Sequence, residues 1–228
     1  AYDFWPETDP DRLHLAHDVL LLVGSDPAKF ARAMTFERVE VLSDDRPKWV
    51  TYGSSLTHCV RAHSPARTWP AIVARRHGLN LTCLGFGGQC HLDPMVGMAI
   101  RDMPADLISL KLGINCLGTG SLSARTYPGA IVALVRIIRE KHPATPLALV
   151  SPIAAPAAET AENAVGMNLT LMREQMQDMY ERLRGLGDEN LRYFSGLDVF
   201  SEAEIAEYAP VDQVHPEADG IEVMAENF

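Results

Sequence analysis

A carboxylate and an imidazole lie three residues apart near the end of the chain, at Asp212 and His215. One turn can bring two such side chains together, so that the carboxylate fixes the imidazole tautomer and leaves the other ring nitrogen free to take a proton. A hydroxyl suits such a base, and Ser55 follows a short apolar stretch that ends at Gly53. A helix beginning there would direct partial positive charge toward a developing anion. These residues together predict nucleophilic chemistry, although each alone also fits a capping or surface role.

Two further segments carry groups that can donate to an oxyanion. Residues 84–89 read Leu-Gly-Phe-Gly-Gly-Gln, and glycine lets the backbone approach a substrate and direct an N–H toward it. Asn115 follows another apolar stretch, and its side-chain amide is a second donor. Each segment alone also fits an ordinary turn. The glycine run is not a dinucleotide fingerprint, because the third glycine of that motif is absent.

In chain order, these segments resemble the four blocks of the SGNH (GDSL-like) hydrolase superfamily, and the resemblance covers residues 48–228. The resemblance implies that Ser55 is the nucleophile and that Asp212 and His215 complete the triad. It also implies an oxyanion hole formed by the N–H groups of Ser55 and Gly88 and by the side-chain amide of Asn115.

The chain departs from the family blocks at two positions. Ser54 stands where the nucleophile block usually has Asp, and Cys116 stands where Asp commonly follows the asparagine. Neither change removes a triad or oxyanion group. His58 and His91 flank the same blocks, and both a structural role and substrate contact remain open for them.

The resemblance implies a serine esterase that hydrolyses small acyl esters through an acyl-enzyme. An acyltransferase that uses the same triad to acylate a sugar or natural-product hydroxyl is the alternative. A non-catalytic binding module of the same fold is a third reading, which the complete residue set disfavours. No metal or organic cofactor is implied, and the expected partner is a small-molecule acyl ester.

The elements that must position these groups alternate between strand and helix from Lys48 onward. Five strands are expected, at residues 49–53, 81–86, 107–112, 147–153 and 191–200. Five helices are expected, at residues 68–77, 95–103, 128–141, 161–186 and 221–228. This alternation predicts an α/β protein with a mostly parallel sheet, and the resemblance implies a three-layer α/β/α flavodoxin-like fold. The reactive segments then follow the first three strands, at the edge where such sheets bind ligands.

Residues 1–47 read differently and are expected to form an N-terminal extension to a catalytic domain at residues 48–228. Residues 36–42 mix apolar and charged side chains like an exposed strand, and residues 43–47 have the composition of a linker. The catalytic region resembles a subgroup in which a β-sandwich precedes the hydrolase domain. Residues 1–47 would supply at most part of such a sandwich.

Composition limits the partners and the compartment expected for the protein. The 228 residues are 47% hydrophobic and carry a formal net charge of −10, which disfavours nucleic acid as a partner. The absence of a basic block and of a long apolar run disfavours membrane binding and membrane insertion. The four cysteines have neither zinc-site nor disulfide-framework spacing, which favours the cytoplasm. Secretion after signal removal stays open, since the chain begins at Ala1.

Overall fold

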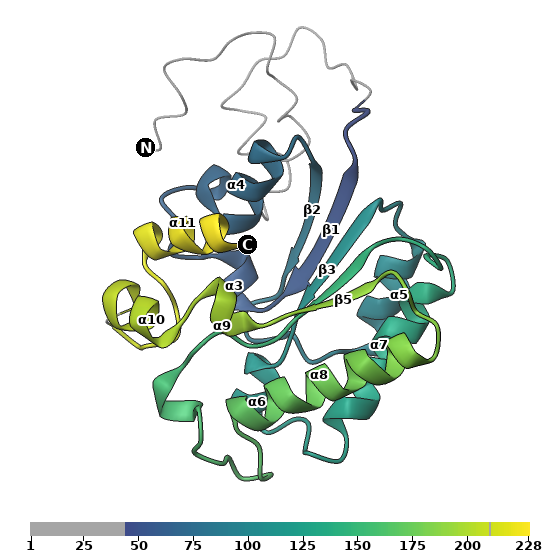
Figure 1. Ribbon diagram of the computed structural model, residues 1–228. Coiled ribbons are helices and arrows are strands. Elements are labelled where there is room, and N and C mark those ends of the chain that lie inside the picture. Colours follow the sequence, from purple (N-terminus) through teal and green to yellow (C-terminus); the bar gives the residue numbers. More distant parts are fainter. Residues whose placement is uncertain (1–43, 210) are drawn as a thin grey trace, which may run out of the picture. The chain divides into compact units, whose positions relative to one another are not determined.

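The computed structural model in Figure 1 describes residues 44–209 and 211–228. The strand expected at residues 36–42 lies outside the described residues, as does nearly all of the proposed extension. The chain divides into two units, and the second of them, Arg46–Phe228, contains every element described below.

The second unit is built on one five-stranded parallel sheet with the strand order β2-β1-β3-β4-β5. Its strands are β1 (Lys48–Gly53), β2 (Asn80–Gly85), β3 (Leu107–Lys111), β4 (Leu147–Val150) and β5 (Leu191–Phe194). This is the flavodoxin-like strand order, so the predicted fold class is confirmed. The chain passes from β1 to β2 on one side and then returns to β3 on the other, which puts the topological switch point between β1 and β3.

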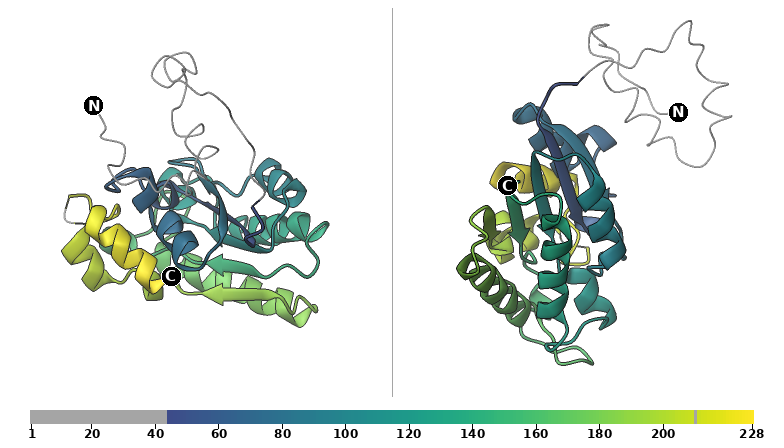
Figure 2. Two further views of the ribbon diagram at one scale, coloured as in Figure 1. Left: turned by 90° about the horizontal axis from the view of Figure 1, so that it is seen from above. Right: turned by 90° about the vertical axis from the view of Figure 1, so that its right-hand side faces the viewer.

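Helices cover both faces of the sheet, as the views in Figures 1 and 2 show. One face is covered by α5 (Pro94–Asp102), α7 (Tyr127–Arg139) and α8 (Leu169–Gly185), and the other by α4 (Trp69–Arg76) and α11 (Ala218–Asn227). Shorter segments lie between these elements: α3 (Ser55–His58), α6 (Ile114–Thr119), α9 (Gly196–Val199), α10 (Glu202–Tyr208) and two 3₁₀ turns at Pro65–Arg67 and Pro156–Ala158.

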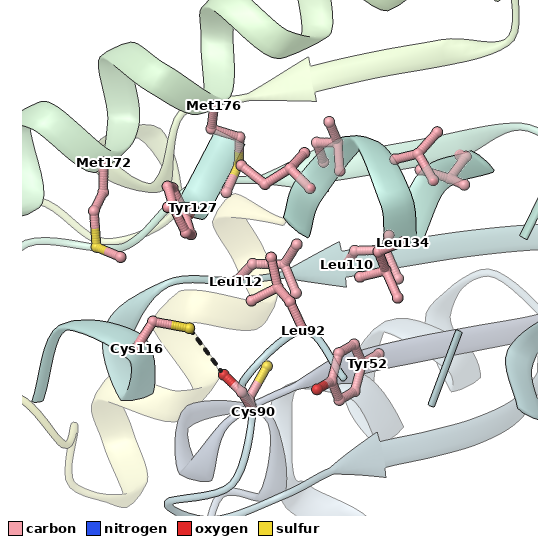
Figure 3. Packing of buried hydrophobic residues seen from close by; sticks show 14 of the residues in the cluster. Tyr52, Cys90, Leu92, Leu110, Leu112, Cys116, Tyr127, Leu134, Met172 and Met176 are labelled. Carbon is pink, nitrogen blue, oxygen red and sulfur yellow. Dashed lines mark hydrogen bonds between the residues drawn. The ribbon is translucent and has the colours of Figure 1, made fainter. Parts of the chain in front are cut away.

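The larger core lies between the sheet and the α5, α7 and α8 layer. Because strand side chains alternate between faces, Val50 and Tyr52 of β1 and Leu110 of β3 point into it. Leu134 of α7 and Met176 of α8 belong to the same cluster, and Figure 3 shows Tyr52 beside Cys90 of the turn after β2. The turns that carry the predicted site therefore rest directly on this core.

The smaller core, on the α4 and α11 face, holds three aromatic rings. Trp49 of β1, Trp69 of α4 and the terminal Phe228 lie with ring centroids 4.5 to 6.0 Å apart. The indole of Trp69 also donates a hydrogen bond of 2.8 Å to the carbonyl of Leu56 in α3. This bond ties the short helix that begins at Ser55 to a rigid aromatic cluster.

Two predicted elements are shorter than expected, because in each case a polar side chain caps a helix inside the predicted range. The helix predicted from residue 161 begins at Leu169, since the Asn168 side chain accepts from the Leu171 N–H. The strand predicted to residue 200 ends at Phe194, since Ser195 caps α9. The other predicted helices and strands are found within three residues of their expected ends.

Candidate active site

Ser55 is the first residue of α3, directly beyond the end of β1. The hydroxyl of Ser54 caps this helix by accepting from the Leu56 N–H at 3.3 Å. Ser54 therefore takes a capping role at the position where the family block usually has Asp, and it is itself buried. The cap leaves the Ser55 N–H at the exposed end of the helix, among the backbone donors without an intrahelical partner.

The second part of the site is the turn from Asp212 to His215. The Asp212 Oδ1 atom accepts from the N–H groups of Val214 and His215, at 3.0 and 2.8 Å. Gln213 takes a left-handed φ of 54°, which is uncommon for a residue with a side chain. The two hydrogen bonds compensate for that conformation, and the turn brings the carboxylate and the imidazole to the same side.

The structure brings Ser55, His215 and Asp212 into one hydrogen-bonded line. The Ser55 Oγ atom lies 2.8 Å from His215 Nε2, and His215 Nδ1 lies 2.9 Å from Asp212 Oδ2. An ionised carboxylate only accepts, so Nδ1 carries the proton and Nε2 is free to accept from the serine hydroxyl. The His215 and Asp212 side chains are about one third exposed, so the line opens to solvent.

The Asp212 carboxyl is held in its ionised form. Partial burial opposes ionisation, but the hydrogen bonds from the backbone and ring of His215 and from the Val214 N–H outweigh it. They lower the pKa of Asp212 from the ordinary 3.8 to about 2. At neutral pH the carboxylate therefore remains a fixed acceptor for the imidazole N–H.

Asn115, the second residue of α6, lies beyond the end of β3. Its Oδ1 atom accepts from the Cys90 N–H at 3.0 Å, so its NH₂ group is the part that remains for a substrate. Gly113 caps α6 at a φ of 121°, where an added Cβ would crowd Pro152 and Tyr127. Only glycine fits there, and it turns the chain so that Asn115 faces the turn after β2.

Gly88 lies in that turn, with a left-handed φ of 72°. The N–H groups of Gln89, Cys90 and His91 are all used within the site, whereas no bond of the described residues uses the Gly88 N–H. Nearby, a Cβ added at Gly87 would lie 3.8 Å from the Ser55 Cβ atom. The glycine turn therefore lies against the nucleophile segment.

His91 contacts both the glycine turn and the segment after α6. Its Nε2 atom lies 3.1 Å from the Gly88 carbonyl oxygen, and its Nδ1 atom lies 2.9 Å from the Ser121 hydroxyl. A carbonyl only accepts, so Nε2 carries the proton and Nδ1 accepts from Ser121. The structure thus gives His91 two structural contacts beside the glycine whose N–H is a predicted oxyanion donor.

The cysteines near these segments are structural thiols in the described part of the chain. Cys116 donates from Sγ to the Cys90 carbonyl, a contact drawn in Figure 3 that joins α6 to the turn after β2. Burial raises the pKa of the Cys59 and Cys90 thiols to about 12 and that of Cys116 to about 11. Thiols held so far from ionisation are poor nucleophiles at neutral pH.

Arg61 is a site residue that the sequence analysis missed. It lies in the segment after α3 and reaches the Asp212 carboxylate, the His215 carbonyl and the Glu217 carboxylate. Together with Val60, Pro216 and Ile221 it lines a shallow depression beside Ser55. One arginine six residues after the serine has no local signal, because its partners lie more than 150 residues away.

Among residues 44–209 and 211–228, no group of three or more His, Cys, Asp or Glu side chains is arranged to hold a metal ion. In the same part of the chain, no helix combines the length and apolar character needed to cross a membrane.

Comparison with known proteins agrees with the fold. The model of the GDSL-like lipase/acylhydrolase family matches residues 47–228, so the chain belongs to this family. The resemblance inferred from the sequence is confirmed. No curated protein sequence matches the chain.

Two solved structures are similar across most of the described chain. The salicylyl-acyltransferase SsfX3 from a tetracycline biosynthetic pathway is 36% identical, with a TM-score of 0.74 over 82% of this chain. A protein from Bacteroides ovatus assigned as a GDSL-like lipase is 25% identical, with a TM-score of 0.66 over 81% of this chain. This chain spans only about half of each, 54% and 52%.

A third solved structure extends the likeness to a shorter protein. A protein from Lactobacillus plantarum is 19% identical, with a TM-score of 0.62 over 80% of this chain and 94% of that one. At this level of identity, the likeness shows the shared fold.

Proposed function

We propose that this chain is a serine esterase that hydrolyses small acyl esters through an acyl-enzyme on Ser55. The observation that carries the proposal is the hydrogen-bonded line from Ser55 Oγ through His215 to Asp212, at 2.8 and 2.9 Å. Membership in the GDSL-like lipase/acylhydrolase family supports ester chemistry at this site. The expected partner remains a small-molecule acyl ester, with neither nucleic acid nor membrane required.

In the first step, Ser55 Oγ attacks the acyl carbonyl while His215 Nε2 takes the hydroxyl proton. The new O–C bond puts negative charge on the former carbonyl oxygen. The N–H groups of Ser55 and Gly88 and the Asn115 amide are the donors proposed to bind that oxygen. Asp212 stabilises the imidazolium and holds its orientation throughout.

In the second step, the intermediate collapses and the bond to the alcohol breaks. His215 Nε2 returns its proton to the leaving alkoxide, which departs as the alcohol. Water then attacks the acyl-enzyme, with His215 again taking a proton, and the acid is released as Ser55 regains its hydrogen. The atoms balance as one water consumed for each ester cleaved.

The experiment that tests this proposal compares wild type with Ser55→Ala on p-nitrophenyl acetate, together with labelling by a fluorophosphonate. We expect wild type to be labelled at Ser55, and Ser55→Ala to lose both labelling and turnover. Asn115→Ala should lower kcat by about 10²- to 10³-fold with a smaller change in KM, since oxyanion donors act in the transition state. Full activity of Ser55→Ala would reject the proposal.

Acyl transfer is the second candidate, and the likeness to the salicylyl-acyltransferase SsfX3 favours it. The same acyl-enzyme would be resolved by an alcohol in place of water, with His215 taking the proton of that alcohol. Product analysis with and without an added acceptor alcohol separates the two. A new ester formed at the expense of free acid indicates transfer, and free acid alone indicates hydrolysis.

A further inference from the structure

Arg61 binds three acceptors in and just after the turn that carries Asp212 and His215. Its Nη2 atom donates to Asp212 Oδ2 at 3.0 Å. Its Nη1 atom donates to the His215 carbonyl oxygen at 3.0 Å and to Glu217 Oε1 at 2.9 Å. The guanidinium thus joins the segment that follows the nucleophile helix to both ends of the opposite turn.

This arrangement differs from an ordinary surface ion pair. Arg76 of α4 also reaches α11, where it donates to the Ala225 carbonyl at 3.4 Å and to the Glu226 carboxylate at 3.3 Å, but its side chain is 47% exposed. The Arg61 side chain is 29% exposed and makes three shorter bonds, at 2.9 to 3.0 Å. Three short, partly buried bonds restrict the turn more than two long, exposed ones do.

We propose that Arg61 is a positioning residue that holds the Asp212–His215 turn against the Ser55 segment and shares the Asp212 carboxylate with the imidazole. This inference rests on the proposed triad. Asp212 Oδ2 receives the His215 ring at 2.9 Å and Arg61 at 3.0 Å, so one oxygen serves both donors. Arg61 therefore sets both the place of His215 and the negative charge that it experiences.

The charged groups that contact His215 and its turn come from three parts of the chain. Asp212 lies in the same turn, Arg61 comes from the segment after α3, and Glu217 precedes α11 and is paired with Arg61. Ser55 faces the other ring nitrogen. Next along the chain on each side, the His63 ring pairs with the Asp219 carboxylate at 3.3 Å, and both side chains are well exposed.

Removing the Arg61 charge has a predictable sign. The Asp212 carboxylate would then act on the imidazole without a competing cation, which favours the protonated ring. Because the reaction needs the neutral ring as base, the acidic limb of the kcat/KM profile should move to higher pH. A purely structural arginine would change the plateau of the profile without moving this limb.

The test uses the full chain and three variants: Arg61→Met, Arg61→Lys and Arg76→Met as the matched control. We expect R61M to lower the plateau of kcat/KM for p-nitrophenyl acetate about 10- to 100-fold, since a misplaced base costs this much. Its acidic limb should also rise by about 0.5–1 pH unit. R61K keeps the charge but loses the fork, so it should lower the plateau and leave the limb in place. R76M should match wild type in both.

Equal profiles for R61M and R76M would overturn the inference. If R61M does not fold, as judged by circular dichroism, Arg61→Gln takes its place: a lowered plateau with a raised acidic limb supports the proposal, and an unmoved limb rejects it. Fluorophosphonate labelling of wild type, and its loss in Ser55→Ala, reports separately on the triad. Failure of the inference with labelling intact therefore leaves the proposed function standing.

Discussion

The Asp212 carboxylate accepts four hydrogen bonds, two at each oxygen. The Oδ1 atom binds the N–H groups of its own turn, and the Oδ2 atom binds the His215 ring and Arg61. One side chain thus both shapes the turn and orients the proposed base. Its effect on activity and its effect on stability should therefore be separable by pH.

Asp212→Asn should lower kcat by about 10⁴-fold, because an amide at this place permits the wrong imidazole tautomer. It should also destabilise the fold at neutral pH. The folded pKa of Asp212 lies near 2, below its ordinary 3.8, so the carboxylate stabilises the fold above pH 3.8. That contribution is lost as the pH falls toward 2, so the difference between D212N and wild type should narrow from pH 7 to pH 3.

Urea unfolding at several pH values and p-nitrophenyl acetate kinetics measure these two effects. Asp219→Asn is the matched control, since this carboxylate pairs with the exposed His63 ring and is 82% exposed itself. The control should leave both kcat and the pH dependence of stability unchanged. A pH-independent loss of stability in D212N would contradict the assigned role of the carboxylate.

At the scale of elements, the site depends on how closely α3 lies against the end of β2. Gly85 is the last residue of β2. A Cβ atom added there would collide with the backbone of Thr57 and His58, so the position requires glycine. The Phe86 N–H, one residue on, donates to the Gly53 carbonyl at 2.8 Å. The glycine and this bond together fix the distance between the nucleophile helix and the glycine turn.

Gly85→Ala should therefore push α3 away from the sheet. We expect a loss of about 1–3 kcal/mol in the free energy of unfolding, as for other overpacked sites, and a kcat at least about 10-fold lower. Gly129→Ala is the matched control, since an added Cβ in this exposed turn of α7 meets nothing within 4 Å. It should be neutral, or stabilise by up to about 1 kcal/mol. An unchanged kcat in G85A would show that the α3 position is not critical.

The amphipathic and apolar elements were predictable from the sequence, and the short ones were not. The helix over residues 128–141 and the strand over residues 107–112 have clear periodicity, and α7 and β3 are found there. Helices α6 and α10 span only six and seven residues, too short for a periodic signal. Their starts depend on a glycine with a φ of 121° and on a capping box at Ser201, which act through local geometry.

At the scale of the molecule, the site could be predicted as far as the topology determines it. Parallel strands bring their carboxyl ends to one edge, so the order of the motifs suffices to group Ser55, Gly88 and Asn115. The partners of Arg61 could not be found this way, because Asp212 and Glu217 lie 151 and 156 residues along the chain. Such a contact is set by how the last turn closes over the sheet, which no local pattern encodes.

The same topology buries a charge-bearing side chain at the centre of the molecule. Lys111 ends β3, between β1 and β4, and is only 4% exposed. Burial lowers the pKa of this lysine from the ordinary 10.5 to about 8. The unfolded chain therefore takes up the proton more readily than the folded protein does, and the lysine weakens the fold below pH 10.5.

Lys111→Met keeps the length of the side chain and removes the amine, so it should stabilise the protein in a pH-dependent way. Above pH 10.5 both states hold a neutral amine, and no gain is expected. The gain in the free energy of unfolding should grow as the pH falls from 10.5 to 8. Below pH 8 it should stay constant, at about 3 kcal/mol at most. Urea unfolding of wild type and K111M from pH 7 to pH 11 measures it. Lys48→Met, at the exposed start of β1, is the control and should change stability little at any pH. A gain in the stability of K111M that did not depend on pH would contradict burial of the charge as its cause.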